Sequence, residues 1–479
     1  MHWHPFLFDK YRILSEVEDF EMETITKENV VVENKMGVMP VNKLLLNMSV
    51  PMMLSMLVQA LYNIVDSIFV SRICEDALTA VSLAFPLQML IVALGGGLGI
   101  GVNALLSRSL GEKNQVNVNN AAMNGILCAL MNAVIFFVLG LTIVKPFYIS
   151  QTTDAEIVTY GIEYLTVICV CSIGVYMQFI FERLLQSTGN TFYAMITQTT
   201  GAVINIILDP ILIFGLCGMP KMGVKGAAVA TVIGQIIAAI LAIIINLKKN
   251  VEIQFKLKGF RPSFAVIKQI YAVGIPSIIM QSIGSIMTYG MNQILIGFSS
   301  TATAVFGVYF KLQSFIFMPV FGLNNGMVPI IAYNFGALKK ERMMKTIKLS
   351  ILYAVSIMTI GMAIFLAVPE KLFMLFNASE QMLGMGIPAL RIICFHFPIA
   401  GFCIVCGSVF QALGNGVYSM VVSICRQVVV LLPVAFLLSL MGNVNYVWLS
   451  FPIAEIASLT LNIIFFSKIK KNIIDKIGA

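Results

Sequence analysis

The strongest constraint on the fold is a series of apolar stretches, each long enough to cross a bilayer. A spanning helix needs about 20 mainly apolar residues, and twelve stretches meet this length: 46–70, 78–106, 120–144, 158–181, 192–216, 225–247, 268–297, 303–332, 346–368, 384–411, 417–440 and 445–467. None alternates in the manner of an outer-membrane barrel strand. Of the 479 residues, 58% are hydrophobic and only 11% are charged, whereas soluble domains carry about 25% charged residues. The sequence therefore predicts an all-α integral membrane protein with twelve transmembrane helices.

Lysine and arginine residues fall mainly on one side of these spans, and this bias sets orientation in the membrane. Eighteen lie on one side: Arg108, Lys113, Arg183, Lys248, Lys249, Lys256, Lys258, Arg261, Lys268, Lys339, Lys340, Arg342, Lys345, Lys348, Lys468, Lys470, Lys471 and Lys476. Five lie on the other: Arg72, Lys145, Lys221, Lys225 and Lys371. We expect a multi-pass protein of the cell membrane with both termini in the cytoplasm. The basic excess is a topology signal, so no nucleic-acid partner is expected.

The chain contains an internal repeat with an offset of 225 residues. GLGIGVNALLSRSLG (97–111) aligns with GLNNGMVPIIAYNFG (322–336), and LLQSTGNTFYAM (184–195) aligns with VFQALGNGVYSM (409–420). Pro51 and Pro276 are separated by the same offset. Each repeat covers six spans, and six is even, so the halves share one orientation and are related by a pseudo-two-fold axis along the membrane normal. The glycine pairs at 97/101 and 322/326 have the spacing that lets helices approach closely.

The repeat and the composition divide the chain into five parts. We expect a cytoplasmic N-terminal tail (1–40), a first lobe with spans 1–6 (41–246), a basic cytoplasmic linker (247–268), a second lobe with spans 7–12 (269–467) and a cytoplasmic C-terminal tail (468–479). The first 36 residues are rich in charge and do not form a signal peptide. They indicate a mobile tail, or an upstream start with Met36 as the initiator.

Ionisable residues at membrane depth are costly and usually functional. Asp66 lies about four residues from the outer end of span 1, and Asp209 about seven from that of span 5. At 1.5 Å per residue these depths differ by only a few ångströms. Asn205 shares a helix face with Asp209, and Pro210 frees a carbonyl beside them.

Span 1 presents polar side chains on the face of Asp66, namely Gln59, Tyr62 and Asn63. Hard cations such as Na⁺ prefer oxygen ligands, and a buried carboxylate without a partner retains a proton. The cluster is therefore interpreted as a site that loads H⁺ or Na⁺ from outside and releases it inside. The alternative is that Asp66 extends to the interface and that neighbouring polar groups satisfy Asp209.

The second lobe lacks this acid pair, since the 225-residue offset places Met291 and Val434 at the equivalent positions. Its membrane-depth charges are Lys311 and Glu455, which we expect to form a pair because an isolated charge there is unfavourable. The alternative is that the long side chain of Lys311 extends to the interface. His396 is interpreted as structural in preference to a proton relay.

These features together resemble the multidrug and toxic compound extrusion (MATE) transporters over about residues 40–470. NIILDPILIFG (205–215), GLGIG…SRSLG, VPIIAYNFG and the paired LLQSTGN/VFQALGN motifs are similar to the prokaryotic branch with MepA- and DinF-like exporters. The resemblance implies cation-driven export of drugs, with Asp66, Asn205, Asp209 and Thr231 as the cation site. Gln59, Tyr62 and Asn63 would face the substrate cavity. No acid lies in spans 7 or 10, which argues against the mechanism of the NorM-like branch.

These expectations describe an antiporter for small amphipathic or cationic drugs, not an enzyme, working as a monomer in the lipid bilayer. No cofactor is expected, nor any metal other than Na⁺ at the coupling site, and the absence of a P-loop argues against ATP drive. A flippase for lipid-linked sugars or phospholipids is the alternative, and it would need a strongly cationic cavity to hold pyrophosphate. A channel is a further alternative, which conductance without a driving gradient would support.

Overall fold

The computed structural model of the chain describes residues 33–255, 259–376 and 378–477, and its regular elements are all helical. The tail predicted for 1–40 thus falls mostly outside the described residues. The first half contains α2 (Lys35–Val38), α3 (Val41–Ser71), α4 (Glu75–Gly111), α5 (Gln115–Thr142), α6 (Val144–Ile149), α7 (Ala155–Val170), α8 (Ile173–Ser187), α9 (Thr191–Phe214) and α10 (Gly223–Lys249).

The second half begins with α11 (Phe264–Ile296), α12 (Ser300–Gly336), α13 (Lys340–Ala367), α14 (Pro369–Met374) and α15 (Glu380–Ile393). It continues through the 3₁₀ turn η1 (Cys394–His396), α16 (Phe397–Ala412), α17 (Gly416–Ile424), the π-helix η2 (Cys425–Leu431), α18 (Leu432–Ser439), α19 (Val444–Val447), α20 (Ser450–Asn472) and η3 (Ile474–Lys476).

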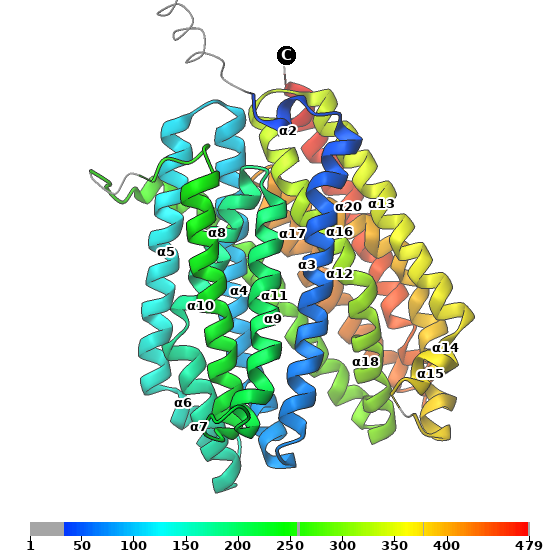
Figure 1. Cartoon of the computed structure of the whole chain (residues 1–479). Helices are drawn as coiled ribbons and strands as arrows, with labels where there is room; N and C mark the ends of the chain where they lie inside the picture. The colour runs from blue at the N-terminus through cyan, green and yellow to red at the C-terminus, as the bar shows by residue number, and fades with distance from the viewer. Residues whose placement is uncertain (1–32, 256–258, 377, 478–479) are drawn as a thin grey trace, which may run out of the picture.

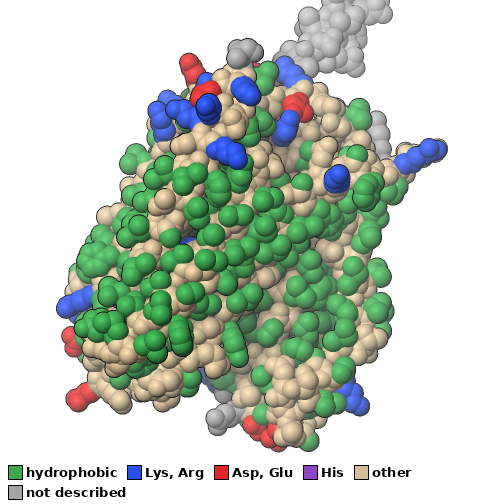
Figure 2. Space-filling model, turned by 180° about the vertical axis from the view of Figure 1, so that it is seen from behind, with side chains coloured by type: hydrophobic (Ala, Val, Ile, Leu, Met, Phe, Trp, Pro, Cys, Tyr) green, Lys and Arg blue, Asp and Glu red, His purple; other side chains and the backbone are tan. Residues whose placement is uncertain are grey.

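The predicted number of spans is confirmed. Eleven helices in the described part of the chain are long and apolar enough to cross a membrane, and α7 and α8 form a twelfth span that is bent by 44°. The tenth span is continuous over Glu380–Ala412 and the eleventh over Gly416–Ser439, although each combines several elements. Large apolar side chains such as Val134, Leu141 and Leu437 remain exposed, and Figure 2 shows hydrophobic surface covering the middle of the molecule. This is the surface expected to face lipid.

Local chemistry explains where the helices begin and end. The side chain of Asn114 accepts a hydrogen bond from the N–H of Asn117 at 3.1 Å and caps α5. Asp154 caps α7 by accepting from the N–H of Glu156 at 2.9 Å. Gly215 ends α9 with a φ of +77°, a left-handed conformation that glycine adopts without strain.

The two halves lie side by side, with both ends of the described chain at the same end of the bundle (Figure 1). Lysine and arginine side chains gather mainly at this end (Figure 2), which we call the basic end. Helix α3 packs against α9 in its own half and against α12 in the other half, and α11 packs against α17 and α4 in the same way. The contacts between halves therefore follow the repeat.

Two repeat-related glycines bring the halves into backbone contact near the basic end. A Cβ atom at Gly111 would overlap the carbonyl oxygen of Tyr333, and one at Gly336 would overlap the carbonyl oxygen of Arg108. Each of these residues is related to its counterpart by the offset of 225. This contact between the two halves, which we call the seam, therefore has the expected pseudo-two-fold symmetry. Gly322 of α12 likewise touches the backbone of Met53 in α3, which agrees with the close approach predicted for the glycine pairs.

The seam predicts a position-specific effect of adding one methyl group. Gly336→Ala places its Cβ against a backbone carbonyl that cannot rotate away, so we expect a loss of about 2 kcal/mol of stability. Gly307→Ala in the same helix is the control, because no atom lies within 4 Å of a Cβ built there. Thermal unfolding of the purified protein should separate the two variants, and equal melting temperatures would contradict the seam.

Candidate functional site

Helix α9 carries the core of the candidate site on one buried face. Asn205 and Asp209 are four residues apart and both are buried, Asp209 completely. Pro210 lies inside the same helix, and its missing N–H leaves the carbonyl of Ile206 without the usual helical donor. The helix therefore presents a carboxylate, an amide and a backbone carbonyl within one turn.

Asn205 connects Asp209 to α10. With its amide oriented to satisfy both ends, Nδ2 of Asn205 donates to Oδ2 of Asp209 at 2.9 Å. Oδ1 then accepts from the hydroxyl of Thr231 at 3.1 Å and from the backbone N–H of Thr231 at 2.9 Å. The opposite orientation, in which Nδ2 donates to the Thr231 hydroxyl, leaves the Asn205 oxygen facing the carboxylate, so the first orientation is chemically correct.

Helix α3 adds the second carboxyl group. The side chains of Asp66 and Asp209 lie next to each other, and the side chain of Tyr62 lies next to that of Thr231. The structure therefore brings together the four residues predicted for the cation site, from three helices of the first half. Tyr62, which the sequence placed both on the face of Asp66 and in the substrate cavity, lies beside this set.

The neighbouring carboxyl groups of Asp66 and Asp209 need a positive charge to offset their mutual repulsion. An ionised carboxylate only accepts hydrogen bonds, so two carboxyl groups in contact require a proton or a metal cation between them. Oδ1 of Asp66 and Oδ1 of Asp209 have no hydrogen-bond partner, and the ion pairs formed within the described residues include neither group. The oxygen-only ligand set suits H⁺ or Na⁺ and is unlike the nitrogen and sulfur sets of transition-metal sites.

The remaining residues predicted for the cavity lie on the same helix, closer to the basic end. Gln59 is half-buried, and its Oε1 accepts a bond of 3.4 Å from Nε2 of Gln198 on α9. Gln198 in turn accepts from the hydroxyl of Ser55. Asn63 is exposed. A polar line therefore continues along α3 from the acid pair toward the middle of the bundle.

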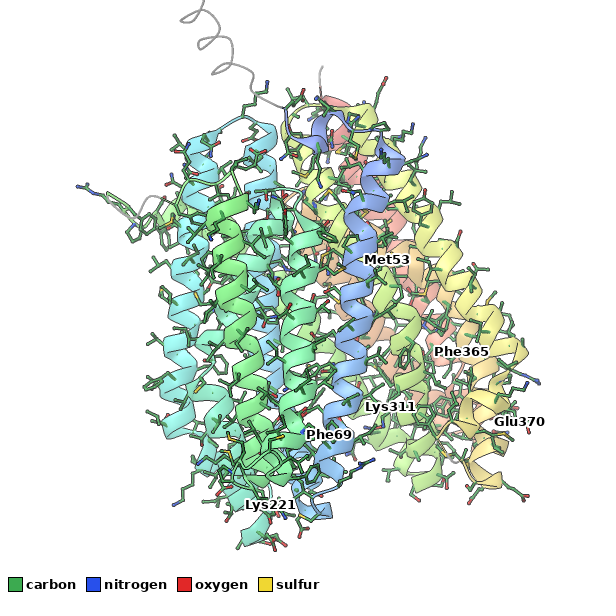
Figure 3. The ribbon with its side chains drawn as sticks, in the orientation of Figure 1. Met53, Phe69, Lys221, Lys311, Phe365 and Glu370 are labelled. Atoms are coloured by element: carbon green, nitrogen blue, oxygen red, sulfur yellow. The ribbon has the colours of Figure 1, made fainter. Side chains whose placement is uncertain are left out.

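The charges of the second half pair differently from the expectation. Glu455 is buried and its Oε2 accepts from Nη1 of Arg426 at 3.1 Å. Lys311 is exposed, and its Nζ lies over the ring of Phe376, 5.9 Å from the centroid. Figure 3 shows Lys311 in the end of the bundle away from the basic end, at a height similar to that of Phe69. The long side chain of Lys311 explains this position, because it can carry its ammonium group toward an interface.

Sequence reasoning missed Arg426 as the partner of Glu455. Arg426 is the second residue of the π-helix η2, and such wider turns often occur at functional positions. Its placement among apolar residues at membrane depth was the available signal. His396 is buried, with Nδ1 2.5 Å from the carbonyl oxygen of Ile393 and its ring against Phe397, which agrees with a structural role.

Glu182 is a further buried acid among the described residues of the first half, and the sequence reading did not assign it a place in the bundle. Glu182 of α8 accepts hydrogen bonds from Nε2 of Gln178 at 3.0 Å and from the hydroxyl of Thr197 at 3.3 Å. The adjacent Arg183 extends elsewhere, and its Nη1 donates to Gln186 at 2.7 Å. Proximity to the helix end made the depth of Glu182 ambiguous in the sequence.

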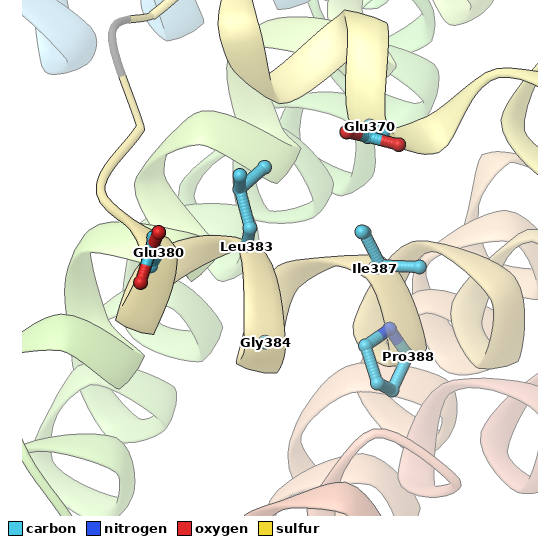
Figure 4. A pocket seen from close by; sticks show the side chains of 6 residues that line it. All are labelled: Glu370, Glu380, Leu383, Gly384, Ile387 and Pro388. Carbon is cyan, nitrogen blue, oxygen red and sulfur yellow. The ribbon is translucent and has the colours of Figure 1, made fainter.

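The surface also has a depression that is unrelated to these groups. It has a volume of about 490 Å³ and lies between α14 and α15 (Figure 4). Its lining consists of Glu370, Glu380, Leu383, Gly384, Ile387 and Pro388. None of the predicted site residues contributes to it, so it has no part in the candidate site.

Comparison with known proteins identifies the family. The MatE family profile matches residues 51–211 and 276–437, one segment in each half. The chain belongs to the MatE family. The matched segments begin at Pro51 and Pro276, which are the prolines related by the internal repeat. The family consists of transporters and not of enzymes.

Several curated MatE relatives are similar along most of their length. The multidrug export protein MepA of Staphylococcus saprophyticus is 31% identical over 415 residues, covering 86% of this chain and 90% of the relative. MepA of Staphylococcus haemolyticus is 29% identical with the same coverage. MepA of Staphylococcus aureus (strain MRSA252) is 28% identical over 419 residues, covering 87% of this chain and 91% of the relative.

Solved MatE structures share the fold. A MATE transporter in complex with MaL6 has a TM-score of 0.86 and 26% identity, covering 92% of this chain and 100% of the other. The outward-facing conformation of a multidrug resistance MATE family transporter has the same score and identity, with 92% and 99% coverage. A MOP superfamily transporter from Pyrococcus furiosus also has this fold, with a TM-score of 0.86 and 25% identity, covering 93% of this chain and 99% of the other.

The ion pair in the second half predicts that removing the arginine alone lowers the stability of the protein more than removing both charges. Arg426→Met leaves the buried carboxylate of Glu455 unpaired and should destabilise the protein by about 2 kcal/mol, less than for a fully buried pair because Arg426 is partly exposed. The double variant Arg426→Met/Glu455→Gln should recover most of this loss. Thermal unfolding measures the stability of both variants. If the double variant were no more stable than Arg426→Met, the loss of stability could not come from an unpaired Glu455 carboxylate.

Proposed function

We propose that this MatE family member is a secondary active multidrug efflux transporter, which exports organic cations and other drugs in exchange for H⁺ or Na⁺. The observation that carries the proposal is the pair of neighbouring carboxyl groups of Asp66 and Asp209, in which Asp209 is completely buried and is connected through Asn205 to Thr231. Acid pairs at membrane depth are costly, and the fold repeats in the second half without one. The names of the MepA relatives, multidrug export proteins, support drugs as the substrate class.

The chemistry of the site suits ion coupling. Two carboxyl groups, the amide of Asn205 and the hydroxyl of Thr231 form a set of oxygen ligands that can hold one proton or one Na⁺. When the cation leaves, the two carboxylates repel each other in a medium of low dielectric constant. The loaded and empty states therefore favour different helix positions, which is the differential interaction that alternating access requires.

The position of the seam supports an outward-facing state. Contacts between the halves occur toward the basic end, where Ser49 of α3 donates to the carbonyl oxygen of Leu323 at 3.1 Å and Met53 touches Gly322. Asp66 lies more than three turns further along α3, in the part of the helix away from this seam. If the basic end is cytoplasmic, as the charge bias predicts, the acid pair is placed to load from the outside.

This orientation puts both termini in the cytoplasm. The proposal further includes a monomer in the cell membrane, with Gln59, Tyr62 and Asn63 facing the path of the substrate. Rocking of the two lobes about the seam exposes this path to each side in turn. The coupling ion needs no separate cofactor, because the site residues hold it directly.

A flippase for lipid-linked sugars or phospholipids is the second candidate. Such a substrate needs unpaired cations to hold phosphate, but Arg426 is already bonded to Glu455. Scrambling of a fluorescent phospholipid by the purified protein in liposomes tests this function, and activity without any drug transport would favour it.

The antiporter predicts that transport depends on both acids. Purified protein in liposomes should move ethidium when a pH gradient or a Na⁺ gradient is imposed, and the gradient that drives it identifies the ion. Asp66→Asn and Asp209→Asn should each reduce transport to the rate of empty liposomes, because an amide cannot exchange a proton or neutralise a cation.

The matched control is Glu370→Gln, which changes an acid exposed on the surface of the second half. It should transport at the wild-type rate. Asp209→Asn should also unfold at the same temperature as wild type or higher, since it removes one of two neighbouring carboxyl groups that repel each other when both are ionised. If well-folded Asp66→Asn and Asp209→Asn proteins transported ethidium at the wild-type rate, these two acids would not be the residues that couple transport to the ion.

A further inference from the structure

The chain just before the first span is bound to both halves of the molecule. Residues 33–39, which we call the bridge segment, include the short helix α2 and lie at the basic end (Figure 1). These residues fall within the stretch that the sequence placed in a mobile tail. Met36 is instead completely buried, which gives the segment an apolar anchor in the bundle.

The bridge segment is fastened to the first half by Asn34. Its Nδ2 donates to the carbonyl oxygen of Thr188, just after α8, at 3.1 Å. The same group donates to Oε1 of Glu252, just after α10, at 2.7 Å. Oδ1 of Asn34 meanwhile caps α2 by accepting from the N–H of Met36 at 3.0 Å. One side chain therefore connects the segment to the ends of two spans and orders its own helix.

The second half binds the segment through α12 and α13. Nδ2 of Asn334 donates to the carbonyl oxygen of Met36 at 3.1 Å. Nη2 of Arg342 donates to the carbonyl oxygens of Met36 at 3.2 Å and Met39 at 2.6 Å. These bonds engage backbone carbonyls that the short helix leaves without internal partners.

Lys339 adds a charged contact between the two parts. Its Nζ forms an ion pair with Glu33 and donates to the carbonyl oxygen of Gly37 at 3.0 Å. The hydrogen bond from Lys339 lowers the pKa of Glu33 below its usual range, so the pair stays ionised at neutral pH. Bonds to charged groups are stronger than neutral ones, although the partial exposure of this pair reduces its strength.

We propose that the bridge segment holds the basic end of the transporter closed and must release the second half before that end can open. The proposal rests on the alternating-access cycle proposed above. In that cycle the halves separate at the basic end, and every bond from Asn334, Lys339 and Arg342 to the segment crosses the line of separation. The segment is continuous with α3, so it moves with the first half when these bonds break.

Hydrogen exchange of the purified full chain, read by mass spectrometry, tests this role without measuring transport. The readout is exchange in the seam, residues 97–111 of α4 and 322–336 of α12. Lys339→Met and Arg342→Met should each raise exchange in both segments about three- to tenfold, since each removes charge-assisted bonds across the seam.

Lys340→Met is the matched control. It removes a neighbouring positive charge whose ion pair with Asp475, 3.1 Å long, lies within the second half. Faster exchange in both seam segments for Lys339→Met and Arg342→Met, with wild-type exchange for Lys340→Met, supports the proposal. Unchanged seam exchange, faster exchange confined to residues 33–39, or an equal effect of Lys340→Met would each overturn it. The liposome assay separately decides whether the protein is an antiporter.

Discussion

Direct backbone contact between the two halves is the constraint on which the rest of this structure depends. Lipid offers no hydrophobic force to press helices together, so they associate through close packing and polar bonds. Gly111 and Gly336 supply the close packing at equivalent positions, each against a carbonyl oxygen of the other half. Because these contacts lie toward one end, the helices are less constrained in the part that holds the acid pair.

Comparing the charged residues of the two repeated halves indicates which half responds to ions. The two halves share their spans and their seam, but the first contains Asp66 and Asp209 in contact, whereas the second contains the self-neutralised pair of Arg426 and Glu455. A carboxyl pair changes its net charge when a cation binds or leaves. An arginine–carboxylate pair resists such a change, because protonating the acid would leave the guanidinium without its partner. The first half is therefore better suited to respond to ions.

The spans and the acid site could be predicted because each depends on local pattern. A bilayer imposes the length of an apolar helix, and depth along two parallel spans places Asp66 beside Asp209. The partner of Glu455 could not be predicted in this way. Arg426 and Glu455 lie on different helices, and the π-helical turns of η2 change the direction in which Arg426 points. The order in residues 33–39 also escaped prediction, because its partners, such as Asn334 and Arg342, are about 300 residues away in the chain.

The bridge segment also divides its work between side chains and backbone. The second half binds the carbonyl groups of Met36 and Met39, so these bonds do not depend on which side chains the segment carries. Asn34 and Glu33 act through their side chains instead, in the bonds to Thr188 and Glu252 and in the ion pair with Lys339. Substitutions within the segment would therefore loosen its attachment to the first half more readily than its backbone bonds to the second.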